Sequence, residues 1–169
     1  MQSLRLYTFS RISLALLLSL LLAACGFQLR GVTQLSFKNL YIQGSPISIS
    51  KELKQSFKTN GIHVVDSAEA ADVLLEIINE SNEKRILSLS GEGVVREYAL
   101  NYSVSFRTRE PANPTWDSVQ TVQTRRDFSY NDSALLGKAE EEAALNNDMR
   151  KDAVREIMRR LTAIKPATK

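Results

Sequence analysis

The sequence has very few of the residues on which most catalytic and metal sites depend. Its 169 residues include one cysteine and one histidine. A single cysteine cannot form an internal disulfide or a cysteine-rich zinc site, so stability has to come from a packed core. The histidine, His63, has no evident catalytic partner, and the sequence contains no nucleophile elbow or phosphate-binding glycine-rich loop. We therefore expect no catalytic residues, no metal site and no cofactor.

Long apolar runs are also scarce. The longest is Leu14–Leu22, which is too short for a transmembrane helix because a bilayer requires roughly 20 apolar residues. Arg5 and Arg11 precede this run, and the small pair Ala23-Ala24 follows it. Positive charge, a short apolar run and small residues in this order are typical of a secretory signal. The sequence therefore predicts a signal peptide over residues 1–24.

The position of the only cysteine, Cys25, is informative. Residues 22–25 (LAAC) resemble a bacterial lipobox, in which the cysteine becomes the lipidated first residue of the mature protein. The alternative is an ordinary cleavage site that happens to precede a cysteine. Acylation would account for an unpaired thiol in an exported protein, and several acyl chains give stable anchoring. Gly26 in place of aspartate favours the outer membrane, so we expect the protein to be anchored there on its periplasmic side.

The charge balance becomes nearly neutral once the leader is set aside. Arg5 and Arg11 are two of the 22 basic residues, which leaves 20 against 19 acidic residues. This balance, together with export, gives no reason to expect a nucleic-acid partner. The remaining length suits one domain. We expect residues 25–36 to be a lipid-anchored tether and residues 37–165 to be a single domain.

The first part of that domain predicts a strand followed by a helix. Residues 37–42 are typical of a strand. The helix is expected to begin with Ser45 as its N-cap and Pro46 at the first helical position. Asn60-Gly61 is a strong stop signal, because glycine adopts the left-handed conformation of a helix cap without steric cost. The apolar residues of this helix recur every four positions: Ile49, Leu53 and Phe57.

A set of strands follows. Residues 62–65 form a short extended piece, and residues 72–78 predict a strand that is apolar on both faces. Residues 86–89 continue this pattern irregularly before a turn at Ser90–Gly93. The clearest strand alternates apolar and polar residues with period two, its apolar members being Tyr98, Leu100, Tyr102, Val104 and Phe106.

The chain is then expected to return through a strand over residues 116–128. Val119 and Val122 are an odd number of residues apart, which predicts a bulge or a register change there. A final long helix is expected to begin near residues 131–133 and to end at Pro166. Its apolar residues again recur every four positions: Leu145, Met149, Ala153, Ile157 and Leu161.

These elements predict an α+β fold in which two helices pack on one face of a four-stranded mixed sheet. The first strand–helix–strand unit implies a parallel pair with a right-handed crossover, and the later hairpins are antiparallel. The second sheet face is expected to be wet and polar. Its expected residues are Asn101, Ser103, Ser105, Gln120, Thr121, Gln123 and Thr124.

Basic residues are the best candidates for a binding site. If the hairpin strands pair directly, Arg107 and Arg109 could meet Arg125 and Arg126 across the ladder. An arginine can donate two parallel hydrogen bonds to a phosphate, and a lysine adds a compact positive charge. Solubilising surface charge is the alternative interpretation. The acidic run Glu140–Glu142 is expected to interact with the helix dipole and solvent, a divalent-ion site being the alternative.

Several segments in a fixed order together resemble the LptE family of lipopolysaccharide-assembly lipoproteins. They are residues 25–31 (CGFQLRG), 60–62 (NGI), 97–100 (EYAL), 126–130 (RDFSY), 135–138 (LLGK) and the helix over 149–161. The resemblance implies a plug that sits in the lumen of the LptD β-barrel, helps that barrel to assemble and binds lipopolysaccharide without making or breaking bonds. A polar surface suits such a lumen.

The resemblance also implies site residues. Lys138 matches a basic position in the family's last-helix segment. The family often has a basic residue in the turn between its second and third strands, but Ser90–Gly93 contains none, so Arg85 and Arg96 are the substitutes from its flanks. With Arg126, these residues form the expected lipopolysaccharide-binding set. The alternative function is a periplasmic regulator of a cell-wall enzyme, which the short tether disfavours.

Overall fold

The computed structural model describes residues 35–44 and 47–164, which belong to one compact unit, Thr33–Lys169. The expected signal peptide, the lipidation site Cys25, the Ser45-Pro46 helix start and the helix end at Pro166 lie outside the described residues. Within the described ranges, no helix has the length and apolar character needed to cross a bilayer.

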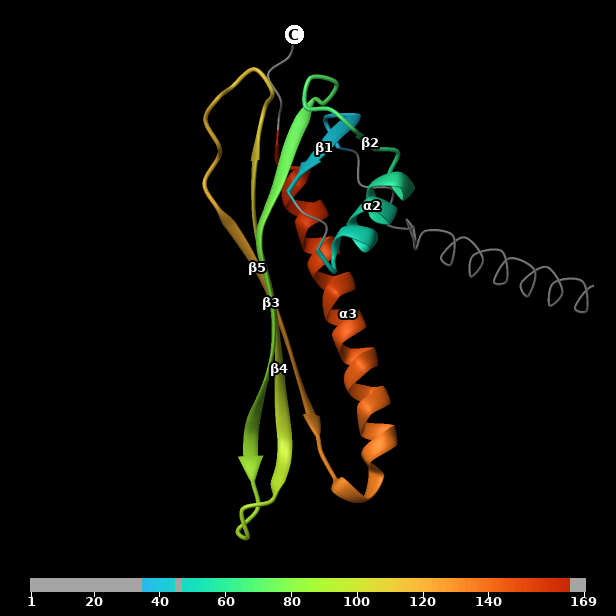
Figure 1. Ribbon diagram of the computed structural model, residues 1–169, viewed down its shortest axis with the longest axis vertical. Helices are drawn as coiled ribbons and strands as arrows, with labels where there is room; N and C mark the ends of the chain where they lie inside the picture. Colours follow the sequence, from blue (N-terminus) through green and yellow to red (C-terminus); the bar gives the residue numbers. More distant parts are fainter. Residues whose placement is uncertain (1–34, 45–46, 165–169) are drawn as a thin grey trace, which may run out of the picture. The chain divides into compact units, whose positions relative to one another are not determined.

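A mixed five-stranded sheet organises the domain, with the strand order β2-β1-β3-β4-β5 (Figure 1). β1 pairs in parallel with both β2 and β3, and β4 pairs antiparallel with β3 and β5. The parallel pair and the antiparallel hairpins confirm the predicted mixed sheet, but the described residues form five strands and not four. The extra strand is β2, and three residues are too few to show an alternating pattern. The strands are β1 (Asn39–Gln43), β2 (His63–Val65), β3 (Val73–Leu89), β4 (Val95–Arg109) and β5 (Gln120–Ser129).

β3 is one long strand and not the short strand with an irregular continuation that the sequence predicts. Its register against β4 shifts between Ile77 and Asn79 and again between Ile86 and Ser88. Each extra residue reverses the alternation of faces, which explains why the period-two pattern is lost. The predicted turn after β3 is confirmed: the amide of Ser90 donates to the carbonyl of Val94 at 2.7 Å, and Gly93 has a φ of 80°.

β5 begins later than predicted, and the predicted bulge at Val119 is wrong. Val119 is 56% exposed and precedes the strand. The amide of Asp117 donates to the carbonyl of Thr108, and the Asp117 carboxylate accepts from Thr108 Oγ1 at 2.8 Å. These bonds hold residues 110–119 as a loop folded back on the end of β4. The spacing that predicts a bulge therefore spans a strand boundary.

Helix α2 (Ser50–Thr59) begins later than predicted and ends as predicted. The amide of Ile47 donates to Ser50 Oγ, and the amide of Ser50 donates to the carbonyl of Ile47, which closes a turn before the helix. At the other end, Gly61 has a φ of 74°, and the amide of Ile62 reaches the carbonyl of Phe57 at 2.9 Å. This is the glycine-containing C-terminal cap that Asn60-Gly61 predicts.

Helix α3 (Leu135–Leu161) follows a short 3-10 turn, η1 (Asp132–Ala134), and lies with α2 on one face of the sheet (Figure 1). The side chain of Asn131 caps η1 by accepting from the amide of Ser133. The predicted apolar stripes are confirmed, with Leu145 only partly buried. The fully buried residues of α3 all come from its C-terminal half: Met149, Ala153, Val154, Ile157, Met158 and Leu161. They pack against the fully buried α2 stripe and the apolar side of the sheet.

Candidate functional site

The register of β3, β4 and β5 decides which side chains share a face. Residues directly opposite one another on paired strands project to the same side of a sheet. Lys84, Leu100 and Arg126 therefore form one row, and this row faces the helices because Leu100 is buried in the core. The next row toward the β3–β4 turn is Ile86, Tyr98 and Phe128.

Lys84 lies in a cage of aromatic rings. Its Nζ is 4.1 Å from the ring centroid of Tyr98, 5.6 Å from that of Phe128 and 5.7 Å from that of Tyr130. Glu142 of α3 contacts the same ammonium group, with 2.5 Å between Nζ and the carboxylate oxygen. Sequence reasoning missed Lys84, because the cage is assembled from strands that the sequence does not place in register.

Lys138, in the first turn of α3, joins the helix to the end of β5. Its Nζ is 3.2 Å from Ser129 Oγ and 2.7 Å from a carboxylate oxygen of Glu141. Its side chain is only 19% exposed. Two carboxylates of the acidic run, Glu141 and Glu142, therefore contact cations and are not simply solvated. Among the described residues, no group of carboxylates, histidines or cysteines could hold a metal ion.

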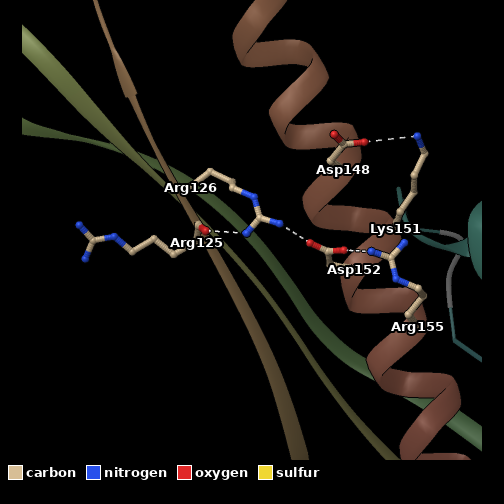
Figure 2. A network of polar contacts seen from close by, with 6 residues as sticks. All are labelled: Arg125, Arg126, Asp148, Lys151, Asp152 and Arg155. Atoms are coloured by element: carbon tan, nitrogen blue, oxygen red, sulfur yellow. Dashed lines mark hydrogen bonds and ion pairs between the residues drawn. The ribbon is translucent and has the colours of Figure 1, made fainter.

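Arg126 extends from β5 to the middle of α3, where it forms an ion pair with Asp152 (Figure 2). Asp152 also contacts Arg155, so two guanidinium groups share one carboxylate. The guanidinium of Arg126 also donates to the carbonyl of Arg125 at 2.8 Å. Arg126 is thus a neutralised link between the sheet and α3.

The other two predicted site residues lie apart from each other. Arg96 is exposed, and its carbonyl accepts from the amide of Tyr130, which places it at the same end of the sheet as Lys138. Arg85 projects from the opposite face, where it is opposite Ala99 and pairs with Glu83. The structure therefore brings Lys138 and Arg96 to one end but does not bring Arg85 to that side of the sheet.

The predicted meeting of four arginines across the hairpin is wrong. The pairing of β4 with β5 ends at Phe106, so Arg107 and Arg109 have no partner on β5. Arg107 instead forms an ion pair with Glu76 on β3. Both guanidinium groups lie over the ring of Trp116, at 4.7 Å and 5.0 Å. The late start of β5 is the physical reason, because it shifts Arg125 and Arg126 toward the other end of β4.

Large apolar side chains are exposed at the end that carries Lys138 and Arg96. We call this region the distal end: the β3–β4 hairpin tip over residues 86–96 and the connection from β5 to α3 over residues 129–138 (Figure 1). Leu136 is 83% exposed there. Exposed apolar side chains at the same end as cations suit a ligand with both anionic groups and hydrocarbon. The exposed apolar residues are Ile86, Leu87, Leu89, Val94, Leu135 and Leu136.

The face away from the helices carries polar and charged side chains. A groove of about 420 Å³ runs along it, with Ser103 of β4 in its floor, Glu83 and Arg85 on the β3 side and Arg125 on the β5 side. The predicted wet face is correct in part. Gln120 is opposite Phe106 and Thr124 is opposite Tyr102, so these two project toward the helices. Those remaining on the polar face are Asn101, Ser103, Ser105, Thr121 and Gln123.

Two tyrosines on the helix side have perturbed hydroxyl groups. Burial, together with the hydrogen bond to Glu80 at 2.6 Å, raises the pKa of Tyr102 well above its usual range. Burial and a hydrogen bond to Asp132 also raise the pKa of Tyr130. Both tyrosines therefore remain neutral at physiological pH, and the ring of Tyr130 faces Lys84 as an uncharged partner.

Comparison with known proteins identifies the relatives of this chain. The family model described as LptE, lipopolysaccharide-assembly, matches residues 37–161. A lipopolysaccharide-assembly lipoprotein LptE from Photorhabdus laumondii is 31% identical over 156 residues, covering 89% of this chain and 84% of the relative. The LptE protein of Yersinia pestis is 30% identical over 153 residues, covering 88% of this chain and 73% of the relative.

Solved structures give the same result for the fold. The solution structure of lipoprotein B from Nitrosomonas europaea is 38% identical and superimposes with a TM-score of 0.74, covering 84% of this chain and 94% of that one. The crystal structure of the rare lipoprotein B from Shewanella oneidensis is 26% identical, with a TM-score of 0.66 and coverage of 75% and 95%. The α+β arrangement described above is therefore shared with bacterial lipoproteins.

Proposed function

Because the chain belongs to the LptE family of lipopolysaccharide-assembly proteins, we propose that it binds lipopolysaccharide through its distal end and plugs an LptD-like β-barrel. Its family has a role in lipopolysaccharide assembly and is not a family of enzymes. The finer proposal concerns the ligand, the barrel partner and the anchoring of this chain. Its site in the cell would be the periplasmic side of the outer membrane.

The observation that carries the ligand proposal is the mixed chemistry of the distal end. Lipid A, the membrane part of lipopolysaccharide, combines phosphate groups with acyl chains. Lys138 and Arg96 supply positive charge at the distal end, and Leu135 and Leu136 supply exposed hydrocarbon beside it. Charge-assisted hydrogen bonds to phosphate are the strong kind, and burial of apolar surface adds to them.

The polar face of the sheet supports the plug proposal. Large barrels of the outer membrane have water-lined, polar interiors. The middle of the central strand β4 presents small side chains on this face, namely Ala99, Asn101, Ser103 and Ser105. A protein enclosed by a polar wall needs such a surface, whereas apolar side chains on it would be left against water.

The experiment that tests this function is purification of the acylated protein from detergent-solubilised outer membranes. We expect a large β-barrel to co-purify in stable amounts, and depletion of the protein to reduce lipopolysaccharide at the cell surface. A preparation without any barrel overturns the plug proposal. Recovery of a peptidoglycan-linked enzyme in its place favours the alternative, a periplasmic regulator of cell-wall enzymes.

The anchor is tested separately. Mass spectrometry of the mature protein is expected to show an N-terminal Cys25 that carries acyl chains, and Cys25→Ala is expected to release the protein from the membrane fraction. An unmodified thiol, or a mature form that keeps residues 1–24, overturns the anchoring proposal. It leaves the distal-end proposal standing, because ligand binding does not require the acyl chains.

A further inference from the structure

The cations between the sheet and α3 are matched by carboxylates of α3. Lys84 contacts Glu142 at 2.5 Å, and Lys138 contacts Glu141 at 2.7 Å. Arg126 contacts Asp152 in the same way further along the helix. A phosphate that binds at Lys84 or Lys138 must therefore compete with a carboxylate that the protein itself supplies.

Lys84 is held in place independently of its carboxylate partner. The three rings of its cage hold one another: Tyr98 stacks on Phe128 with centroids 5.9 Å apart and meets Tyr130 edge-on at 5.0 Å. The faces of aromatic rings attract a cation within about 6 Å of their centroids. The ammonium group therefore keeps its position when Glu142 leaves, and its exposed side can take another anion. Its side chain is 34% exposed, so an anion can reach it from solvent.

The half of α3 that carries both carboxylates is weakly attached. No residue from Leu135 to Asp148 is fully buried, and Leu145 contributes only partial burial. One polar atom of this half, Asn146 Oδ1, is buried without a hydrogen-bond partner. Unsatisfied buried polar atoms destabilise the arrangement that contains them. Displacement of this half of the helix therefore loses little core packing and exposes an amide oxygen that can then accept a hydrogen bond from water.

We propose that Lys84 is a phosphate-binding residue beside the distal end, and that Glu141 and Glu142 are internal anions that the phosphate of the ligand displaces. The inference rests on the proposed function and deepens it. The acidic run keeps the site neutral when it is empty, and binding moves the N-terminal half of α3 away from the cage. The chemistry recognised is a phosphate group, whether it belongs to lipid A or is free in solution.

The test is equilibrium binding of purified lipopolysaccharide to the full acylated chain in detergent. Glu141→Gln with Glu142→Gln removes the competitors, and Glu140→Gln is the matched control from the same run. An ion pair near the protein surface is worth up to about 1 kcal/mol, so we expect the double variant to bind about threefold to tenfold more tightly. The control is expected to bind as the wild type does.

Lys84→Gln is expected to weaken binding at least about tenfold, the loss typical of one charge-assisted hydrogen bond. It is also expected to remove the gain given by Glu142→Gln when the two changes are combined. If Lys84 had a purely structural role, Lys84→Gln would lower thermal stability, but Glu142→Gln would still increase the affinity in the combined variant. The conservative variant Lys84→Arg is expected to restore most of the affinity, because it keeps the positive charge within the cage.

Two further binding measurements distinguish free phosphate from the phosphate groups of lipid A. Inorganic phosphate is expected to compete weakly, and lipopolysaccharide stripped of its lipid A phosphates is expected to lose the advantage in the double variant. If the wild type binds lipopolysaccharide and the Glu141→Gln, Glu142→Gln variant binds it with the same affinity, only the proposed competition by the internal carboxylates is overturned. Binding that is unaffected by Lys84→Gln overturns the role of Lys84. Failure of every variant, wild type included, to bind lipopolysaccharide overturns the proposed function and this inference with it.

Discussion

Reversal of charge at Lys138 tests the distal end most directly. In Lys138→Glu, the new carboxylate lies three residues from Glu141 and loses the hydrogen bond to Ser129. Like charges at this helical spacing cost about 0.2–0.5 kcal/mol, and a lost hydrogen bond adds about 0.5–1.5 kcal/mol. The domain should therefore remain folded, with an unfolding midpoint lowered by only a few degrees.

The effect on ligand binding should be larger than the effect on stability. A lysine–phosphate contact is worth about 1.5–3 kcal/mol, so its removal predicts an affinity for lipopolysaccharide lower by about tenfold to a hundredfold. The acidic replacement also repels the phosphate directly. Titration with purified lipopolysaccharide measures the loss, and thermal unfolding of the same samples measures the cost to the fold.

Lys151→Glu is the matched control. Lys151 lies on the same helix and also pairs with an acid three residues away, Asp148, at 3.4 Å. It stands 13 residues further along α3, which is about 20 Å at 1.5 Å per residue, and it lies beside α2. An equal loss of affinity in both variants, or normal affinity in Lys138→Glu, would refute the assignment of Lys138 to the ligand site.

The remaining predictions concern the scaffold. Gly61→Ala should lower the free energy of unfolding by about 1–2 kcal/mol in urea titrations, because Gly61 has a φ of 74°; the added methyl group meets no neighbouring atom, so no steric clash adds to this cost. Ile157→Ala should cost about 2–5 kcal/mol in the same assay, because Ile157 is fully buried. Hydrogen bonds from Arg159 and Arg160 lower the pKa of Glu156 to about 2 from its ordinary 4.5. Its contribution is therefore complete above pH 4.5 and is lost as the pH falls toward 2, and Glu156→Gln should remove about 1 kcal/mol of this pH-dependent stability in acid titrations.

The elements with regular apolar spacing could be predicted from the sequence. The four-residue repeat of Ile49, Leu53 and Phe57 places the buried side of α2 correctly, because a helix brings such positions to one side. The alternation from Tyr98 to Phe106 likewise identifies the packed face of β4. In both cases the apolar residues recur regularly because the whole element packs one side against the core.

The features that could not be predicted depend on register between distant segments. The bulges in β3 reverse its pattern, and β2 is too short to have one. Lys84 and Glu142 are 58 residues apart, and they meet only because the register of β3 on β4 and the position of α3 are both fixed by the core. Periodicity reports burial along one segment, and it contains no information about which polar residues of two segments meet. The same limit explains why the four arginines of the hairpin do not meet.

The unequal packing of α3 separates stability from ligand binding within one helix. From Met149 to Leu161 the helix is held by its buried stripe, so changes at the distal end leave this anchor intact. From Leu135 to Asp148 it is held mainly by polar contacts with the sheet, such as those of Glu142 with Lys84 and of Lys138 with Ser129. Polar contacts near the surface can be exchanged for contacts with a charged ligand at little net cost, whereas buried apolar contacts cannot, because their loss exposes hydrocarbon to water. A single long helix can thus keep the sheet covered at one end while its other end opens for a ligand.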